Sequence, residues 1–274
     1  MPAREFRQVD VFTDRPYLGN PVAVVLDGTG LDDDEMLVVA RWTNLSETTF
    51  VLPPTDSGAD YRVRIFTPSR ELPFAGHPTL GTCHAWLEGG GEPRAAGEIV
   101  QECPAGLVRI RRTDGRLAFE APPVIRSGAV DEELVERIAG MLRLAREEIV
   151  DSQWVDNGPG WVAVLLRDAE TVLAIRPDVV DLELGVVGPR GGGDFEVRAF
   201  FRVPGGTAED PVTGSLNASL AQWLLASGRA TAPYVASQGT ALGRRGRVHI
   251  SADGGGTVWV GGGTVTCVAG AIEL

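Results

Sequence analysis

Two short stretches decide the fold, Phe74-Ala75-Gly76-His77-Pro78-Thr79 and Asp210-Pro211-Val212-Thr213-Gly214-Ser215. In each stretch a glycine precedes a polar residue, and an apolar pattern with the period of a helix follows. A helix that starts without a side chain in the way leaves its first backbone N–H groups accessible to an anion, and the helix dipole favours negative charge there. Two such starts that face each other would form a carboxylate-binding cleft.

The segments around these stretches repeat one order of elements. Each half has a buried strand, an alternating strand, a loop and a glycine-headed helix. We expect these elements at residues 22–26, 61–67 and 78–88 in the first half and at 161–166, 196–203 and 215–226 in the second. Pro78 is expected in the first helical position. The repeat predicts two similar lobes with a pocket between them, and Pro122-Pro123 is the predicted crossover.

A further amphipathic helix is expected after Asp131, which is a suitable N-cap residue. Its apolar face would consist of Leu134, Val135, Ile138, Met141 and Leu142, which recur at helical spacing. The acidic run Asp32-Asp33-Asp34-Glu35 favours the first turn of another helix, which would extend to about Thr43.

Composition limits the classes of partner. The net charge of −12 over 274 residues argues against nucleic acid and anionic membrane surfaces, which require a basic face. The apolar runs are too short to span a bilayer, and no apolar signal core follows Met1. Three scattered cysteines, Cys83, Cys103 and Cys267, form neither a disulfide framework nor a zinc motif. We therefore expect a cytoplasmic protein without a metal site.

Two residues of the first half are candidates for proton transfer. Glu47 lies between a helix end and an apolar strand, where a glutamate is either a solvated residue at a strand start or a buried general base. His77 stands at a helix N-terminus, where the dipole disfavours an imidazolium, so we expect a neutral imidazole that forms a hydrogen bond. A purely structural cap is the alternative for His77.

Two residues of the second half flank the other helix start. Asp210 either forms a turn with an Asx cap or orients a polar group of a substrate. Ser215 fits an N-cap, and because no GxSxG motif surrounds it we do not expect covalent serine chemistry.

Taken together, five motifs resemble the PhzF-type phenazine biosynthesis family. They are Gly19-Asn20-Pro21-Val22-Ala23-Val24, Asn44-Leu45-Ser46-Glu47-Thr48-Thr49-Phe50-Val51, Arg64-Ile65-Phe66-Thr67-Pro68, Glu71-Leu72-Pro73-Phe74-Ala75-Gly76-His77-Pro78 and Glu209-Asp210-Pro211-Val212-Thr213-Gly214-Ser215.

The resemblance implies a diaminopimelate-epimerase-like α+β fold. Two pseudo-symmetric lobes would each be a mostly antiparallel sheet or barrel around a central helix. The first lobe would comprise residues 1–120 with the last strand, 264–274, and the second would comprise residues 121–263. The resemblance also implies a homodimer and an enzyme that uses no cofactor.

The resemblance further implies the site. The acid/base glutamate of the family falls on Glu47, and its assisting residues fall on His77, Asp210 and Ser215. Gly76 and Gly214 fall where the substrate carboxylate is bound. Ser46, which precedes Glu47, and Thr213, which precedes Gly214, are further expected substrate-binding residues.

The sequence departs from the related epimerases at one informative place. Those enzymes use two cysteines, one heading each helix, and the equivalent positions here are Ala75 and Thr213. Neither side chain can remove a Cα proton, so two-thiol racemisation is disfavoured and proton shuttling by one carboxylate remains.

The function implied is isomerisation of a small unsaturated amino or hydroxy acid, similar to a dihydro-hydroxyanthranilate, in secondary metabolism. Epimerisation or C–C bond hydrolysis of a related acid is a second interpretation. A catalytically silent protein that binds small acids is a third interpretation.

Overall fold

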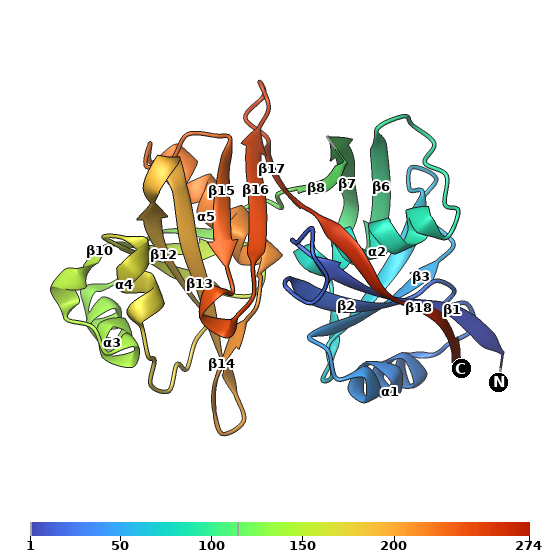
Figure 1. The fold of residues 1–274 in the computed structure, drawn as a ribbon, viewed down its shortest axis with the longest axis horizontal. Helices are drawn as coiled ribbons and strands as arrows, with labels where there is room; N and C mark the ends of the chain where they lie inside the picture. Colours follow the sequence, from blue (N-terminus) through green and yellow to red (C-terminus); the bar gives the residue numbers. More distant parts are fainter. Residues whose placement is uncertain (1, 114) are drawn as a thin grey trace. The chain divides into compact units, whose positions relative to one another are not determined.

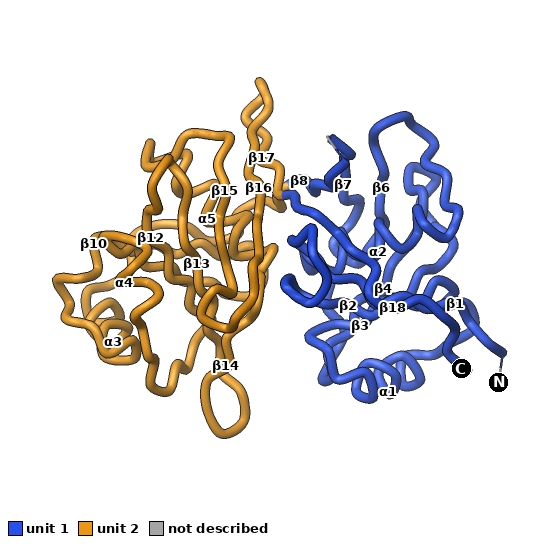
Figure 2. The backbone as a smooth tube through the Cα atoms, viewed as in Figure 1, with its two compact units in different colours: residues 1–120, 261–274 blue, residues 121–260 orange. Residues whose placement is uncertain are grey.

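The computed structural model of the protein describes residues 2–113 and 115–274, so Met1 and Asp114 lie outside the described residues. The chain divides into two compact units (Figure 2): residues 1–120 with 261–274 form unit 1, and residues 121–260 form unit 2. The last strand, β18 (Thr264–Glu273), pairs antiparallel with the first strand, β1 (Ala3–Val11). The end of the chain therefore belongs to the same unit as its beginning.

The helices of unit 1 are α1 (Asp33–Thr43) and α2 (Gly76–Glu88). Besides β1 and β18, its strands are β2 (Asn20–Val25), β3 (Glu47–Leu52), β4 (Tyr61–Phe66), β5 (Glu71–Leu72), β6 (Glu98–Cys103), β7 (Gly106–Thr113) and β8 (Arg116–Glu120). Unit 1 is the blue part of Figure 2, and Figure 1 labels its helices α1 and α2 and its strands β1, β2, β3, β6, β7, β8 and β18.

The helices of unit 2 are α3 (Glu132–Leu142), α4 (Ala169–Ala174) and α5 (Gly214–Ala226). Its strands are β9 (Arg126–Ala129), β10 (Ile149–Asp156), β11 (Val162–Leu166), β12 (Leu184–Arg190), β13 (Asp194–Val203), β14 (Gly206–Asp210), β15 (Tyr234–Gln238), β16 (Gly246–Ala252) and β17 (Val258–Gly262), the last of which leads back into unit 1. Short 3₁₀ turns are η1 (Arg146–Glu148), η2 (Gly191–Gly193) and η3 (Thr240–Leu242).

The two units repeat one order of strand pairings. In unit 1, β1 pairs antiparallel with β2, β2 parallel with β3, β3 antiparallel with β4, and β4 parallel with β6. In unit 2, the same alternation joins β10, β11, β12, β13 and β15. Parallel neighbours need a crossover, and helices supply it: α1 and α2 in unit 1, α4 and α5 in unit 2. The repeated topology confirms two pseudo-symmetric halves.

The central helices α2 and α5 are buried over most of their surface. α2 packs against β1, β2 and β3, and α5 packs against β10 and β16. Each helix therefore lies against the sheet of its own unit, with its N-terminus held in a fixed place.

Both central helices begin earlier than the sequence predicts. α2 begins at Gly76 with Ala75 as N-cap, so Pro78 is the third helical residue rather than the first. α5 begins at Gly214 with Thr213 as N-cap, so Ser215 is not the cap. A proline is accommodated at the third position because the first N–H groups of a helix have no intrahelical acceptor.

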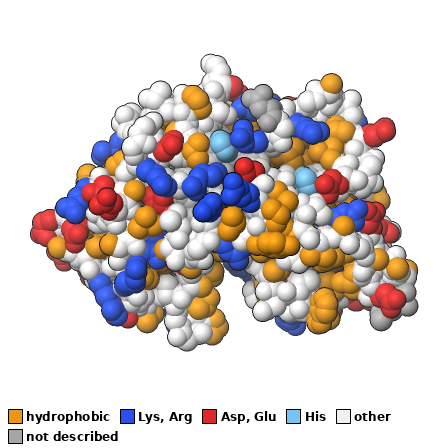
Figure 3. Space-filling view, viewed as in Figure 1, with side chains coloured by type: hydrophobic (Ala, Val, Ile, Leu, Met, Phe, Trp, Pro, Cys, Tyr) orange, Lys and Arg blue, Asp and Glu red, His pale blue; other side chains and the backbone are white. Residues whose placement is uncertain are grey.

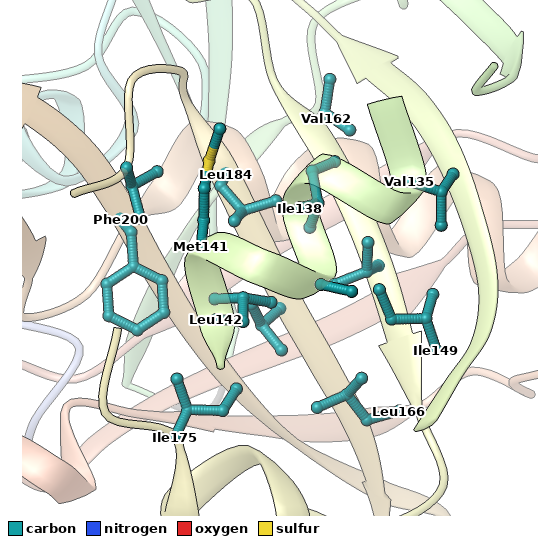
Figure 4. Packing of buried hydrophobic residues seen from close by; sticks show 14 of the residues in the cluster. Val135, Ile138, Met141, Leu142, Ile149, Val162, Leu166, Ile175, Leu184 and Phe200 are labelled. Atoms are coloured by element: carbon teal, nitrogen blue, oxygen red, sulfur yellow. The ribbon is translucent and has the colours of Figure 1, made fainter. Parts of the chain in front are cut away.

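The core of unit 2 forms around α3. As predicted, Val135, Ile138, Met141 and Leu142 are buried and Leu134 packs against them. Figure 4 shows these side chains meeting residues from β10, β11, β12 and β13. This apolar cluster fixes the strands that precede the α5 start.

The surface carries charges of both signs. Figure 3 shows arginines beside acidic and apolar side chains on the visible face, so the net charge of −12 does not make that face uniformly acidic. Among the described residues, none of the helices combines the length and the apolarity needed to span a bilayer.

Candidate active site

The first cluster of candidate residues lies in unit 1, where three element starts meet. Glu47 is the first residue of β3, Asn20 is the first residue of β2, and His77 is the second residue of α2. Because β2 and β3 are parallel, with Val22 opposite Glu47, their N-terminal ends share one edge of the sheet. The topology therefore brings together residues that are far apart in sequence.

The geometry of this cluster is tight. Nε2 of His77 lies 3.2 Å from Oε2 of Glu47, and the two side chains are only 6% and 14% exposed. On the other side of the ring, Nδ2 of Asn20 lies 3.4 Å from Nδ1 of His77. The imidazole is thus held between an amide and a carboxyl group.

The imidazole is neutral at physiological pH. Burial lowers the pKa of His77 to about 3, although a hydrogen bond to the Pro21 backbone acts in the opposite direction. The N-terminus of α2 also disfavours an imidazolium. This agrees with the neutral imidazole expected from the sequence. A neutral imidazole ring can both donate and accept hydrogen bonds.

The second cluster lies in unit 2, at the start of α5. Asp210 ends β14, and its Oδ2 accepts a hydrogen bond of 2.6 Å from the hydroxyl of Thr213. The backbone N–H of Thr213 donates to Oε1 of Gln238 at 3.0 Å. Both donors of Thr213 are therefore engaged within unit 2, and its side chain is a link in a polar network.

Ser215, the second residue of α5, is held by two side chains from the β10–β11 region. The indole Nε1–H of Trp161 donates to its Oγ at 3.1 Å, and Nδ2 of Asn157 donates to its carbonyl at 2.8 Å. An indole N–H is a donor only, so the hydroxyl oxygen is the acceptor in this contact. The hydroxyl hydrogen of Ser215 consequently points away from Trp161.

The remaining predicted residues occupy the expected elements. Gly76 and Gly214 are buried first residues of α2 and α5. Ser46 is exposed immediately before β3. The structure thus groups Glu47 with His77 in unit 1, and Asp210 with Thr213 in unit 2. The predicted cleft and the substrate contacts of these residues remain predictions.

Sequence reasoning missed several members of the clusters. Asn20 belongs to a motif that the sequence does single out, but its contact with His77 needs the strand register. Trp161 follows Asn157-Gly158-Pro159-Gly160, a stretch similar to Gly19-Asn20-Pro21 in the first half, which is a weak signal. Gln238 ends a short strand and has no local signal that would mark it.

The cysteines take no part in either cluster. Burial raises the pKa of Cys83 to about 12, so its sulfur stays a thiol. Burial also raises the pKa values of Cys103 and Cys267. Residues 2–113 and 115–274 contain no group of three or more His, Cys, Asp or Glu side chains arranged to hold a metal ion.

A separate cavity of about 420 Å³ lies at the other end of α2, where its lining includes Tyr61, Trp86 and Gly89. None of the eight predicted site residues is among the described residues that line it. Its position at the C-terminal end of the helix separates it from the Glu47 cluster at the N-terminal end.

One known protein family matches most of the chain. The sequence profile described as phenazine biosynthesis-like protein (PhzC-PhzF) matches residues 9–270. Antisense-enhancing sequence 1 of Schizosaccharomyces pombe is 35% identical over 293 residues, covering 98% of this chain and 99% of that protein. The trans-2,3-dihydro-3-hydroxyanthranilate isomerase of Pseudomonas aeruginosa is 34% identical and covers 90% of each chain.

Solved structures show the same fold. A PhzF family protein of Bacillus anthracis superposes with a TM-score of 0.84 at 22% identity, covering 100% of both chains. A hydroxyproline epimerase of Agrobacterium vitis gives a TM-score of 0.61 at 15% identity, covering 98% of this chain and 92% of the other. These likenesses confirm the α+β fold class expected from the sequence. The profile match and the near full-length relatives show that the chain belongs to the phenazine biosynthesis-like (PhzF) protein family.

Proposed function

We propose that the protein is a cofactor-independent isomerase that moves a proton along the conjugated system of a small unsaturated amino or hydroxy acid. One observation carries the proposal: the carboxyl group of Glu47 is buried against the neutral imidazole of His77. A relative that is 34% identical is named for the isomerisation of trans-2,3-dihydro-3-hydroxyanthranilate, which makes this acid the first substrate to test.

In the proposed mechanism Glu47 is both base and acid. Its carboxylate removes a proton from a carbon next to the conjugated system, and the electron pair of the C–H bond delocalises into that system. The same carboxyl group then returns the proton to another carbon, so the reaction needs neither an oxidant nor a reductant. His77 stabilises the charge that develops, by a hydrogen bond from a ring without charge.

The helix starts supply the binding of anionic and polar groups. Backbone N–H groups at Gly76 and Gly214 are placed where helix dipoles favour a carboxylate. Asp210 and Ser215 bind the amine or hydroxyl group of the substrate, the first as an acceptor and the second through its hydroxyl hydrogen. In this proposal the active protein is a homodimer, which sedimentation analysis of the purified chain tests.

The test is incubation with trans-2,3-dihydro-3-hydroxyanthranilate in D₂O, followed by proton NMR and mass spectrometry. We expect an isomer of unchanged heavy-atom composition, and a loss of roughly 10²- to 10⁴-fold in rate for Glu47→Gln. Glu133→Gln, an exposed substitution in α3, serves as the matched control. Deuterium exchange at a stereocentre would instead indicate an epimerase, a product of lower mass a C–C hydrolase, and binding without turnover a silent binding protein.

A further inference from the structure

Gln238, the last residue of β15, is fully buried and forms four hydrogen bonds with its side chain. Its Oε1 accepts from the backbone N–H of Thr213 at 3.0 Å and from Nδ2 of Asn217 at 2.8 Å. Its Nε2 donates to the hydroxyl of Thr213 at 2.9 Å and to the backbone carbonyl of Asp210 at 3.1 Å. With two hydrogen bonds accepted at Oε1 and two donated from Nε2, the side-chain amide uses its full hydrogen-bonding capacity.

The neighbours of Gln238 permit only one orientation of its amide. The backbone N–H of Thr213 can only donate, so the oxygen Oε1 must face it. The carbonyl of Asp210 can only accept, so the nitrogen Nε2 must face that side. The amide therefore has a fixed polarity in a buried site.

This polarity sets the direction of the Thr213 hydroxyl. Because Nε2 of Gln238 donates to Oγ1 of Thr213, that oxygen is an acceptor on this side and its hydrogen points elsewhere. The hydrogen lies on the contact with Asp210, where Oγ1 of Thr213 donates to Oδ2 at 2.6 Å. A charge-assisted bond of this kind is short and among the stronger hydrogen bonds in proteins.

We propose that Gln238 is a positioning residue of the site: acting through Thr213, it holds the Asp210 carboxylate in one orientation as a hydrogen-bond acceptor. The proposal extends the proposed function, because it explains what keeps Asp210 in place to receive an amine or hydroxyl group. It also gives a role to Thr213, which stands where the related epimerases carry a cysteine. The hydroxyl there serves the neighbouring carboxylate rather than removing a proton.

Unit 1 offers a matched control for this glutamine. Gln101 in β6 is also fully buried, accepts from the hydroxyl of Tyr61 at 3.0 Å and donates through Nε2 to Oγ1 of Thr79 at 3.0 Å. Thr79 is the fourth residue of α2, as Asn217 is the fourth residue of α5. Gln101→Glu therefore makes the same isosteric change beside the other central helix, without a hydrogen bond to either candidate cluster.

The first arm of the experiment does not depend on any substrate. Crystal structures of the wild type and Gln238→Glu are compared at the Thr213–Asp210 contact. A carboxylate at position 238 attracts the hydroxyl hydrogen of Thr213, so we expect the separation of Oγ1 and Oδ2 to open beyond about 3.5 Å. An unchanged separation in the variant would overturn the inference.

The second arm measures turnover of trans-2,3-dihydro-3-hydroxyanthranilate. Loss of a hydrogen bond to a charged group predicts a decrease in kcat/KM of about 10- to 100-fold for both Gln238→Glu and Thr213→Val. Thr213→Ser keeps the hydroxyl and is expected to retain most of the activity. Both changes break the same series of contacts, which runs from residue 238 through residue 213 to Asp210. The kcat/KM of the double variant Gln238→Glu/Thr213→Val should therefore be no lower than that of the more impaired single variant.

Controls separate positioning from stability. Gln101→Glu should lower the melting temperature as much as Gln238→Glu does, yet leave kcat/KM within about threefold of the wild type. Equal losses of activity in the two variants, or additive losses in the double variant, would contradict the inference. If the wild type does not turn over the acid, the proposed function fails, and the crystallographic arm alone decides the role of Gln238.

Discussion

Arg198 donates two hydrogen bonds to the carboxylate of Glu209, from Nε at 2.9 Å and from Nη2 at 2.7 Å, immediately before Asp210 in the chain. Arg64 makes the same two-pronged contact with Glu71, at 2.8 and 2.6 Å. In both units the glutamate precedes the first helical glycine by five residues, Glu71 before Gly76 and Glu209 before Gly214. Each pair therefore ties the strand that leads into a central helix to the neighbouring strand.

The pair in unit 2 is the more deeply buried one. The side chains of Arg198 and Glu209 are 5% and 10% exposed, whereas those of Arg64 and Glu71 are 21% and 30% exposed. Arg198 also donates to the carbonyls of Val172 and Ile175. Removing one partner of a buried pair leaves the other charge without compensation in a poorly solvated place.

We therefore predict a graded loss of stability when the arginines are replaced. Arg198→Met should lower the free energy of unfolding by about 3 to 5 kcal/mol, and Arg64→Met by less. Arg146 makes a similar two-pronged contact with Glu132 on the surface of unit 2, so Arg146→Met is the control and should leave the urea midpoint unchanged. If Arg146→Met lowered the free energy of unfolding as much as Arg198→Met does, burial of the ion pair would not determine the size of the loss.

A pH-dependent loss of stability is expected from His77. Burial lowers its pKa from 6.5 to about 3, so at intermediate pH the unfolded chain binds a proton that the folded chain excludes. The contribution of the neutral ring is fully present above the unfolded pKa and is lost as the pH falls. The cost is about 1.4 kcal/mol for each pH unit in this window.

The measurement is urea unfolding of the wild type and of His77→Gln at several values between pH 7 and pH 4. The stability of the wild type relative to the variant should decline as the pH falls below about 6. A repeat in the Glu47→Gln background separates the ring from the carboxyl group that faces it. A difference between the two proteins that stays constant over this range would contradict a neutral buried imidazole.

Local signals in the sequence account for the parts of the fold that were predicted. The helices around Ile138, Leu80 and Leu216 show apolar residues at helical spacing, and such periodicity is readable within a few turns. Glu47 and His77 lie in sequence motifs that can be recognised from a few consecutive residues. The helix starts were misplaced by one or two residues, because Pro78 and Ser215 carry typical start signals while Gly76 and Gly214 do not.

Two strands that the sequence analysis does not predict, β6 and β12, have polar or small residues on their buried side. β6 points Ile99, Gln101 and Cys103 inward, so its alternation is not one of apolar against polar. β12 contains Gly185 and Gly188, which are unfavourable in isolated strands. A Cβ on Gly185 would lie 2.5 Å from the Leu216 side chain, a contact with α5 that only the folded chain reveals. The role of Gln238 also could not be predicted from local sequence, because its hydrogen-bond partners lie more than twenty residues away in the chain.

Trp161→Phe tests whether the indole orients the hydroxyl of Ser215. The substitution keeps an aromatic ring in the buried site but removes the Nε1–H that donates to Oγ at 3.1 Å. We expect kcat/KM to fall about threefold to tenfold on a turned-over substrate, as for one neutral hydrogen bond. In the Ser215→Ala background, Trp161→Phe should lower kcat/KM much less, because the hydroxyl group that the indole orients is absent.

Trp259 provides the control for this variant. It is buried in unit 2 and its Nε1–H donates at the same distance, 3.1 Å, to Oδ2 of Asp253. Trp259→Phe should reduce stability to a similar extent without the decrease in kcat/KM. If both variants lose activity in parallel, the indole of Trp161 acts through stability alone.

Gly81 and Gly140 predict opposite results for the same substitution, glycine to alanine inside a helix. A Cβ on Gly81 in α2 would lie 2.3 Å from Cγ1 of Val22 and 3.0 Å from Cγ2 of Val11, and both valines are fully buried. Because a valine side chain is stiff at χ1, the strand must move, which costs about 1 to 3 kcal/mol. A Cβ on Gly140 in α3 meets no atom within 4 Å, so alanine there gains helix propensity. Urea unfolding should show Gly81→Ala less stable than the wild type and Gly140→Ala more stable by about 0.5 to 1 kcal/mol. If Gly81→Ala were instead more stable than the wild type, α2 would not pack this closely on β2.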